Sequence, residues 1–169
     1  MSQLFDAFNI MPAENAEAAL LHCCAAGRWA HGLTMLRPFA DPDSLFAAAD
    51  RVWSTMEEAD WMEAFRAHPR IGEHKAAHAS EQSASWSRQE QSSAVAAKAD
   101  VLSELAAANQ RYEELFGFTY IVCATGKSAD EMLRILEHRL HGNRQSELRE
   151  AAEQQRQIMQ IRLRKWLAI

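Results

Sequence analysis

The scarcity of helix-breaking residues is the feature that most constrains the fold of this chain. Only six glycines and four prolines occur in 169 residues, and alanine is abundant. Runs of β-forming residues are nearly absent, and Phe118 to Cys123 is the only strand-like stretch. That stretch has no evident partner strand in the sequence. The chain is therefore predicted to be all-α.

Apolar periodicity and capping signals place two helices clearly. Over residues 45–56 apolar side chains recur at spacings of three and four, with Asp41 as a plausible N-cap and Pro42 at the first helical position. Residues 128–131 (Ser-Ala-Asp-Glu) form a capping box that opens a second helix. Gly142 is the expected stop of that helix.

The remaining pattern predicts one compact bundle of roughly eight helices over residues 1–169, which is a single domain. Further helices are expected at residues 13–26, 28–36 and 88–115, and a long terminal helix from Asn143. Residues 74–87 are rich in Ala, Ser and His without a clean period. We expect them to form a loop or short helical pieces over a site.

Charge and cysteine content narrow the class of protein. A formal net charge of -5 argues against nucleic-acid binding, which needs Lys and Arg to neutralise phosphates. No apolar run approaches the roughly 18 residues of a membrane span. The three cysteines, Cys23, Cys24 and Cys123, do not form a secreted disulfide framework, and residues 1–10 do not resemble a signal peptide. A cytoplasmic protein is expected.

His68 stands in the first candidate constellation, Phe-Arg-Ala-His-Pro-Arg-Ile-Gly-Glu at residues 65–73. Proline disfavours the α conformation at the residue before it, so His68 is predicted to lie where a helix ends and the chain turns. The helix dipole there favours the cationic imidazole, which suits a proton donor near neutral pH. The alternative is that His68 only caps the helix.

Glu90 stands in the second constellation, Ser-Arg-Gln-Glu-Gln at residues 87–91. Ser87-x-x-Glu90 fits a capping box that opens the predicted helix over residues 88–115. A functional interpretation places Glu90 and Gln91 at this helix N-terminus, where backbone N–H groups can hold an anion. The two interpretations can hold together.

Residues 116–128 form the third candidate segment. Its Gly126-Lys127-Ser128 is part of a P-loop pattern, but the required earlier glycine is replaced by Ile121, so nucleotide binding is rejected. An extended apolar segment before a helix can instead present backbone groups to a ligand. In this apolar context Cys123 is expected to be a packed side chain rather than a nucleophile.

Arg162 is the fourth candidate, because it falls between Ile158 and Trp166 on the apolar arc of the terminal helix. A buried arginine implies a carboxylate nearby, from the protein or from a ligand, whereas the alternative is a side chain that reaches solvent at the helix end. The seven histidines show no convincing metal-ligand spacing. No metal site is predicted.

Together and in this order, these segments resemble the 2-oxo-4-hydroxy-4-carboxy-5-ureidoimidazoline (OHCU) decarboxylases, which act after urate oxidation and produce allantoin. His-Pro-Arg-Ile-Gly followed by Ser-x-x-Glu-Gln is the most diagnostic pair. The resemblance runs through nearly the whole chain and includes residues 4–12, 65–73, 87–91, 112–124 and 158–167. One departure is Thr119, where proline is expected, and it affects only the rigidity of that turn.

The resemblance implies an all-α fold, a homodimer, and catalysis without a metal or organic cofactor. It assigns the catalytic histidine to His68 and the catalytic glutamate to Glu90. The substrate contacts that it implies are Pro69, Ser87, Arg88, Gln89, Gln91, Tyr120, Ile121, Val122, Cys123, Ala124 and Arg162.

The chemistry of OHCU agrees with these residue types. The substrate carries a carboxylate and a hydroxyl on one ring carbon, next to a C=N bond that accepts electrons as CO2 leaves, so no external electron sink is required. The intermediate must then be protonated on one face of the ureido-bearing carbon to give (S)-allantoin, a task for His68 as general acid. Glu90 is expected to orient the substrate hydroxyl or to tune the imidazole.

Two other functions remain open at this point. The first is a hydrolase in which His68 and Glu90 activate water on a ureide, distinguished by release of ammonia or a ring-opened acid instead of CO2. The second is a non-catalytic helical interaction module that uses Trp53, Trp61 and Trp86 as a partner surface. It predicts a broad exposed apolar patch instead of a closed polar pocket.

Overall fold

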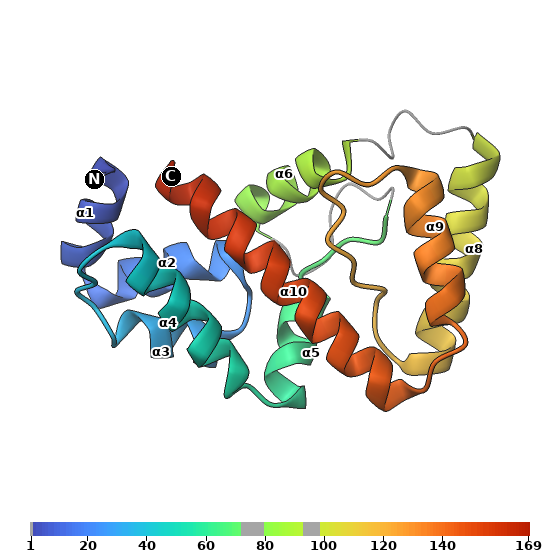
Figure 1. Ribbon diagram of the computed structural model, residues 1–169, viewed down its shortest axis with the longest axis horizontal. Coiled ribbons are helices and arrows are strands. Elements are labelled where there is room, and N and C mark those ends of the chain that lie inside the picture. The colour runs from blue at the N-terminus through green and yellow to red at the C-terminus, as the bar shows by residue number, and fades with distance from the viewer. Residues whose placement is uncertain (1, 72–79, 93–98) are drawn as a thin grey trace. The chain divides into compact units, whose positions relative to one another are not determined.

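The computed structural model describes residues 2–71, 80–92 and 99–169 (Figure 1). Within these residues the chain forms nine helices and no β-strand, which confirms the all-α prediction. The helices are α1 (Gln3–Ile10), α2 (Ala13–Cys23), α3 (Gly27–Thr34), α4 (Pro42–Ser54), α5 (Glu58–Arg66), α6 (Glu81–Glu90), α8 (Ala99–Phe116), α9 (Ala129–Arg139) and α10 (Arg144–Leu167). None of these described helices is long and apolar enough to cross a membrane.

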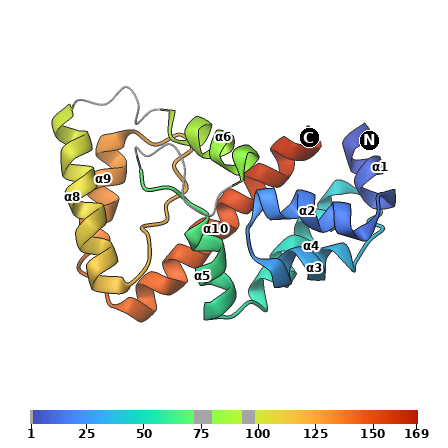
Figure 2. The same cartoon turned by 180° about the vertical axis from the view of Figure 1, so that it is seen from behind.

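The helices belong to two compact units. One comprises the chain up to Ala64 together with Arg156–Ile169, and the other comprises Phe65–Gln155. Helices α1 to α4 lie in the first unit and α6, α8 and α9 in the second, whereas α5 and α10 contribute residues to both. Figure 2 shows the same helices from behind.

Local capping chemistry starts three of the helices where the sequence predicts. The Asp41 side chain accepts the N–H of Ser44, with Pro42 at the first turn of α4. Ser128 and the third helical residue of α9 form a reciprocal capping box. The Asn143 side chain accepts a backbone N–H of the first turn of α10 at 3.0 Å. The predictions for these helix starts are confirmed.

Large apolar side chains fill the core of the first unit. Fully buried examples are Phe5, Phe8, Leu20, Trp29, Leu33 and Leu45. The indole N–H of Trp29 on α3 donates to the carbonyl oxygen of Ala49 on α4 at 3.1 Å. A Cβ at Gly32 would lie 3.0 Å from Val52, so glycine there lets α3 and α4 approach closely.

An aromatic cluster around Tyr112 of α8 fills the core of the second unit. Its ring lies edge-on to Phe116, Phe118 and Tyr120, with centroid separations of 4.6 to 5.7 Å. Phe65, near the end of α5, adds a ring 5.5 Å from Phe118. The segment after α8 is therefore anchored between α8 and the end of α5.

The helix bounds predicted for the middle of the chain are wrong. The helix predicted over residues 88–115 is divided: α6 ends at Glu90 and α8 begins at Ala99, with residues 93–98 outside the described part of the chain. The predicted irregular segment over residues 74–87 contains most of α6, while its residues 74–79 are not described. The buried face of α6 consists of Ser83, Ala84, Trp86 and Ser87, so small and polar residues hide its period.

Candidate active site

His68 lies in the turn that follows α5. The helix ends at Arg66, and the N–H of His68 donates to the carbonyl oxygen of Phe65 at 3.0 Å. The ring is half-buried, and Pro69 after it is buried. The predicted position of His68 at a helix end is confirmed.

The imidazole of His68 meets a buried amide on α10. Its Nε2 lies 2.6 Å from Oε1 of Gln155, and Gln155 is fully buried. An amide oxygen can only accept a hydrogen bond, so this arrangement places a proton on Nε2. Gln155 was not recognised in the sequence, because 87 positions separate the two residues.

Glu90 is the last residue of α6 and is half-buried. The predicted capping box of Ser87 and Glu90 is wrong, because the N-cap of α6 is Ser80, whose side chain accepts the N–H of Ser83 at 3.1 Å. Ser87 is buried inside the helix, and its carbonyl oxygen accepts the N–H of Gln91 at 3.0 Å. The interpretation of Glu90 as a carboxylate at the N-terminus of this helix is withdrawn.

The other α6 candidates differ in exposure. Arg88 and Gln89 are exposed, whereas Gln91, which caps the C-terminus of α6, is half-buried.

The segment from Tyr120 to Ala124 has no regular secondary structure and is buried, with its residues 2% to 6% exposed. It pairs with no strand among the described residues, and protein groups take several of its polar atoms. The N–H of Cys123 donates to Oε1 of Gln154 at 2.8 Å, and Nζ of Lys127 donates to the Cys123 carbonyl oxygen at 2.8 Å. The hydroxyl of Tyr120 donates to the carbonyl oxygen of Met132 at 3.1 Å.

A buried cluster of Arg139, Glu147 and Tyr112 holds the backbone of this segment in place. Arg139 donates from Nη1 to the carbonyl oxygen of Ile121 at 2.7 Å and from Nη2 to the hydroxyl of Tyr112 at 3.1 Å. Burial is the main cause that raises the pKa of both Tyr112 and Tyr120, so both phenols stay neutral. Although burial acts to lower the pKa of Arg139, Tyr112 and Glu147 raise it above its ordinary value, and the guanidinium stays charged.

This cluster was missed in the sequence although a signal for it exists. Arg139 follows Met132 and Leu136 at helical spacing and therefore falls on the buried face of α9. An arginine on an apolar face implies a buried partner, and Glu147 supplies it across the turn at Gly142. The pattern that predicts an inward Arg162 on α10 therefore also predicts an inward Arg139 on α9.

Arg162 is buried on α10, only 2% exposed, as its place on the apolar arc predicts. Its charge acts on two neighbouring buried thiols of the same unit, Cys23 and Cys24. Burial raises the pKa of both thiols, that of Cys24 to about 12, and the positive charge of Arg162 opposes the increase. Both thiols are therefore neutral and poor nucleophiles at physiological pH.

The structure brings two of the predicted site segments to neighbouring residues of α10. Two consecutive glutamines of α10 hold them: Gln154 binds the backbone at Cys123, and Gln155 binds the ring of His68. Glu90 lies in the same compact unit, whereas Arg162 lies in the other. Among the described residues, no three His, Cys, Asp or Glu side chains are placed to hold a metal ion.

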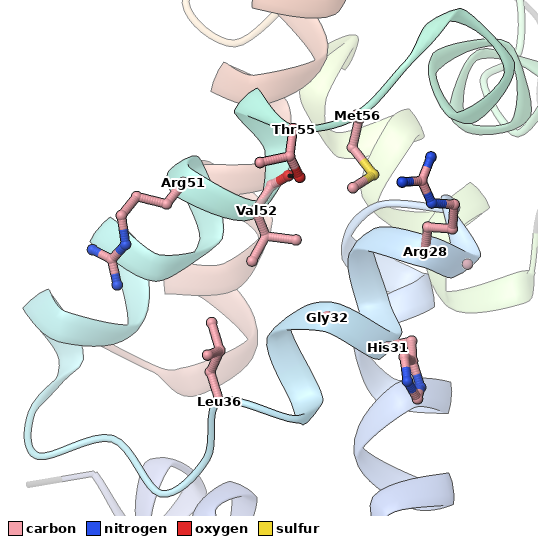
Figure 3. Close-up of a pocket in the computed structure, with 9 residues that line it drawn as sticks. Arg28, His31, Gly32, Leu36, Arg51, Val52, Thr55 and Met56 are labelled. Atoms are coloured by element: carbon pink, nitrogen blue, oxygen red, sulfur yellow. Dashed lines mark hydrogen bonds between the residues drawn. The ribbon is translucent and has the colours of Figure 1, made fainter.

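A separate pocket of about 660 Å³ lies between α3 and α4 in the first unit (Figure 3). Apolar side chains such as Leu36, Val52 and Met56 line it, and none of its lining residues is a predicted site residue. Two of its polar side chains already have partners: Arg28 pairs with Asp60, and the ring of His31 lies against the carboxyl of Glu17, each at 2.7 Å.

Comparison with known proteins decides the family. The sequence profile of the OHCU decarboxylase family matches residues 9–164. The chain belongs to this family. It is 35% identical over 144 residues to the uric acid degradation bifunctional protein TTL of Arabidopsis thaliana, an alignment that covers 85% of this chain and 44% of that protein.

Two further family relatives match the chain over most of their own length. The 2-oxo-4-hydroxy-4-carboxy-5-ureidoimidazoline decarboxylase of Haloferax volcanii is 27% identical over 128 residues, 75% of this chain and 73% of that protein. A crystal structure of an OHCU decarboxylase in the presence of (S)-allantoin superposes with a TM-score of 0.78 at 30% identity, covering 94% of this chain and all of that one. By contrast, the chain spans less than half the length of the bifunctional Arabidopsis relative.

Proposed function

We propose that this chain decarboxylates OHCU to (S)-allantoin and CO2 in urate breakdown, with His68 as general acid and Glu90 as the residue that orients the substrate. The observation that carries the proposed reaction is the family match over residues 9–164, and the roles of His68 and Glu90 are proposed from the family resemblance. The reaction is a carboxy-lyase reaction of purine catabolism.

The proposed reaction needs no cofactor. As CO2 leaves, the electron pair of the broken C–C bond moves toward the neighbouring C=N bond of the substrate, which serves as the electron sink. The ureido-bearing carbon then takes a proton from the imidazolium of His68. The substrate hydroxyl becomes a carbonyl as it loses its proton, and the ring nitrogen that received the electron pair takes up one proton, so the reaction consumes one proton overall, the one from His68. Because the imidazole delivers its proton from one side, one enantiomer forms.

The position of Glu90 suits an orienting role. It ends a helix whose preceding turn is anchored by buried Trp86 and Ser87, so the carboxylate is mounted on a fixed element. A carboxylate there can accept the hydrogen bond of the substrate hydroxyl and hold the scissile C–C bond in one orientation.

The proposed substrate contacts come from the segments that the family resemblance assigns. They are Pro69, Ser87, Arg88, Gln89, Gln91, Tyr120, Ile121, Val122, Cys123, Ala124 and Arg162. Arg162 is a buried cation and is proposed to bind a ring carbonyl or carboxylate of the substrate. A tight grip on the departing carboxylate would stabilise the ground state, so a ring carbonyl is the better partner for catalysis.

We further propose one functional domain over residues 1–169 that acts as a cytoplasmic homodimer. The family profile crosses from one compact unit into the other, which supports a single functional domain. Three buried cysteine thiols support a reducing compartment. Family resemblance supports the dimer, and light scattering coupled to size exclusion measures it directly.

The test follows the circular dichroism of allantoin formed from freshly generated OHCU. Wild-type enzyme is expected to build an optical signal, and His68→Asn is expected to lose about 10²- to 10⁴-fold in rate, since asparagine cannot deliver a proton near pH 7. His141→Asn is the matched control, because His141 is exposed on the turn after α9. A wild-type signal from His68→Asn would remove His68 from the chemistry, and release of ammonia instead of CO2 would favour a ureide hydrolase.

A further inference from the structure

Gln155 has an environment that surface glutamines do not have. It is 0% exposed and lies on the buried face of α10 with Ala151, Ala152, Ile158 and Met159. Only its Oε1 has a hydrogen-bond partner among the described residues, Nε2 of His68 at 2.6 Å, whereas its own Nε2 has none. Burying a long polar side chain costs free energy unless a hydrogen bond compensates for the lost contacts with water. The hydrogen bond to His68 is the one that compensates here.

We infer that Gln155 is a positioning residue for His68: it fixes the ring and keeps a proton on Nε2, so that the proton given to the substrate leaves from Nδ1. This inference rests on the proposed role of His68 as general acid. Because Oε1 accepts, Nε2 carries hydrogen in both the neutral and the cationic imidazole. The proton that is gained or lost near neutral pH is therefore the one on Nδ1.

The proton balance of the step follows from this assignment. Departure of CO2 turns its C–C electron pair into a ring C=C bond, and the former C=N pair moves onto the ring nitrogen, which takes up the proton that the substrate hydroxyl loses. As that hydroxyl becomes a carbonyl, the C=C pair forms the C–H bond at the ureido-bearing carbon with the proton from Nδ1. The Nδ1 electron pair stays on the imidazole, which ends as the neutral tautomer with hydrogen on Nε2. That product tautomer is the one that Gln155 stabilises, so the ring does not have to rearrange.

The backbone on either side of His68 is fixed as well. The N–H of His68 is held by Phe65, and Pro69 limits the next peptide. The ring still needs an anchor of its own, and Gln155 supplies it from a helix whose preceding residue, Gln154, binds Cys123. One turn of α10 thus aligns the ring of His68 with the backbone of the proposed substrate-binding segment.

The first test is made on the wild-type enzyme. Long-range ¹H–¹⁵N spectra of protein with ¹⁵N-labelled histidine, with the signal of His68 assigned by its loss in His68→Asn, report which ring nitrogen carries hydrogen. Neutral His68 is expected to show hydrogen on Nε2. A neutral ring with hydrogen on Nδ1 overturns the inference, whether or not His68 proves to be the general acid.

The second test uses two variants of Gln155 and a control. Gln155→Met keeps the length but has no accepting oxygen, and it is expected to lower kcat about 10- to 100-fold, change KM much less, and abolish the preference for hydrogen on Nε2. Gln155→Glu keeps an accepting oxygen and is expected to retain the Nε2 hydrogen. Gln145→Met, exposed on the same helix, is expected to behave as wild type.

The outcomes separate the two proposals. If His68→Asn is inactive while folded Gln155→Met keeps wild-type kcat, Gln155 does not position His68, although the proposed function stands. If His68→Asn remains active, His68 is not the general acid. The wild-type spectrum then still shows whether Gln155 keeps hydrogen on Nε2 of His68. If Gln155→Met does not fold, as judged by its far-ultraviolet spectrum, the wild-type spectrum and Gln155→Glu decide the inference.

Discussion

Nε of Arg139 donates to Oε2 of Glu147 at 2.7 Å, and both residues are buried, 6% and 5% exposed. The same glutamate oxygen accepts the hydroxyl of Tyr112 at 2.8 Å. Because Arg139 also holds the carbonyl oxygen of Ile121, the ion pair connects the stability of the second unit with the shape of the proposed substrate-binding segment.

Replacing one partner of this ion pair is expected to cost more than replacing both. Arg139→Leu leaves the charge of Glu147 buried without its cation, and is expected to lower the free energy of unfolding by about 3–5 kcal/mol. The double variant Arg139→Leu, Glu147→Leu removes both charges and is expected to be more stable than Arg139→Leu. Urea unfolding at pH 7 measures both.

Arg134→Leu provides the matched control for this cycle. Arg134 is exposed on the same helix, so its loss is expected to change the free energy of unfolding by less than about 0.5 kcal/mol. If the double variant proved less stable than the single variant Arg139→Leu, the ion pair would not be the dominant interaction of Glu147.

The ion pair of Arg70 and Glu113 is expected to make stability depend on pH. The hydrogen bond from Arg70, two residues after His68, is the main cause that lowers the pKa of Glu113 below its ordinary value of 4.5. A carboxyl whose pKa is lower in the folded state contributes stability above its unfolded pKa, and loses it as pH falls through the folded pKa. Since Arg70 is about half exposed, the contribution is less than about 1 kcal/mol.

Glu113→Gln measures this contribution. The variant is expected to unfold at lower urea than wild type at pH 7, and the difference is expected to shrink as pH is lowered below 4.5 toward the folded pKa. Glu114→Gln, the exposed neighbour on α8, serves as the control. An equal difference between Glu113→Gln and wild type at every pH would mean that the charge of Glu113 is not responsible.

The sequence was most informative where the structure depends on neighbouring residues. Asp41, Ser128 and Asn143 each cap a helix through hydrogen bonds to residues three positions away, so their roles are visible in a short window. The inward position of Arg162 also followed from local periodicity. Conversely, α6 was misplaced because serine and alanine make up most of its buried face.

The supporting shell of the candidate site could not be predicted in this way. Gln155 is 87 positions from His68, and Gln154 is 31 positions from Cys123. The helical period of α10 places Gln155 on the buried face with Ile158 and Met159, but it does not indicate which residues the two glutamines contact. Their roles follow from the fold, which places one turn of α10 beside two segments that are distant in sequence.

Turnover is expected to survive metal removal. In the proposed mechanism the substrate accepts its own electrons and His68 supplies the proton, so a chelator removes nothing that the reaction needs. Enzyme dialysed against EDTA is expected to form (S)-allantoin at the rate of the untreated enzyme. If dialysis abolished the rate and Zn²⁺ or Mn²⁺ restored it, a metal ion would act as a Lewis acid in the reaction, and the proposed mechanism would be wrong.

The adjacent glutamines of α10 are expected to have separable kinetic roles. Gln154→Leu removes the acceptor for the N–H of Cys123 and so loosens the segment proposed to contact the substrate in both ground and transition states. Loss of such uniform binding raises KM and leaves kcat nearly unchanged. One neutral hydrogen bond corresponds to about a 3- to 10-fold rise in KM.

Steady-state kinetics on freshly generated OHCU compare this variant with Gln155→Met, which is expected to lose kcat instead. Gln145→Leu controls for the loss of a glutamine from α10, since its side chain is exposed. If Gln154→Leu lowered kcat as much as Gln155→Met did and left KM unchanged, the segment at Cys123 would act on the reacting atoms instead of binding the substrate. Opposite defects at neighbouring positions would place the two functions on one turn of the helix, because the side chains of Gln154 and Gln155 leave α10 in directions about 100° apart.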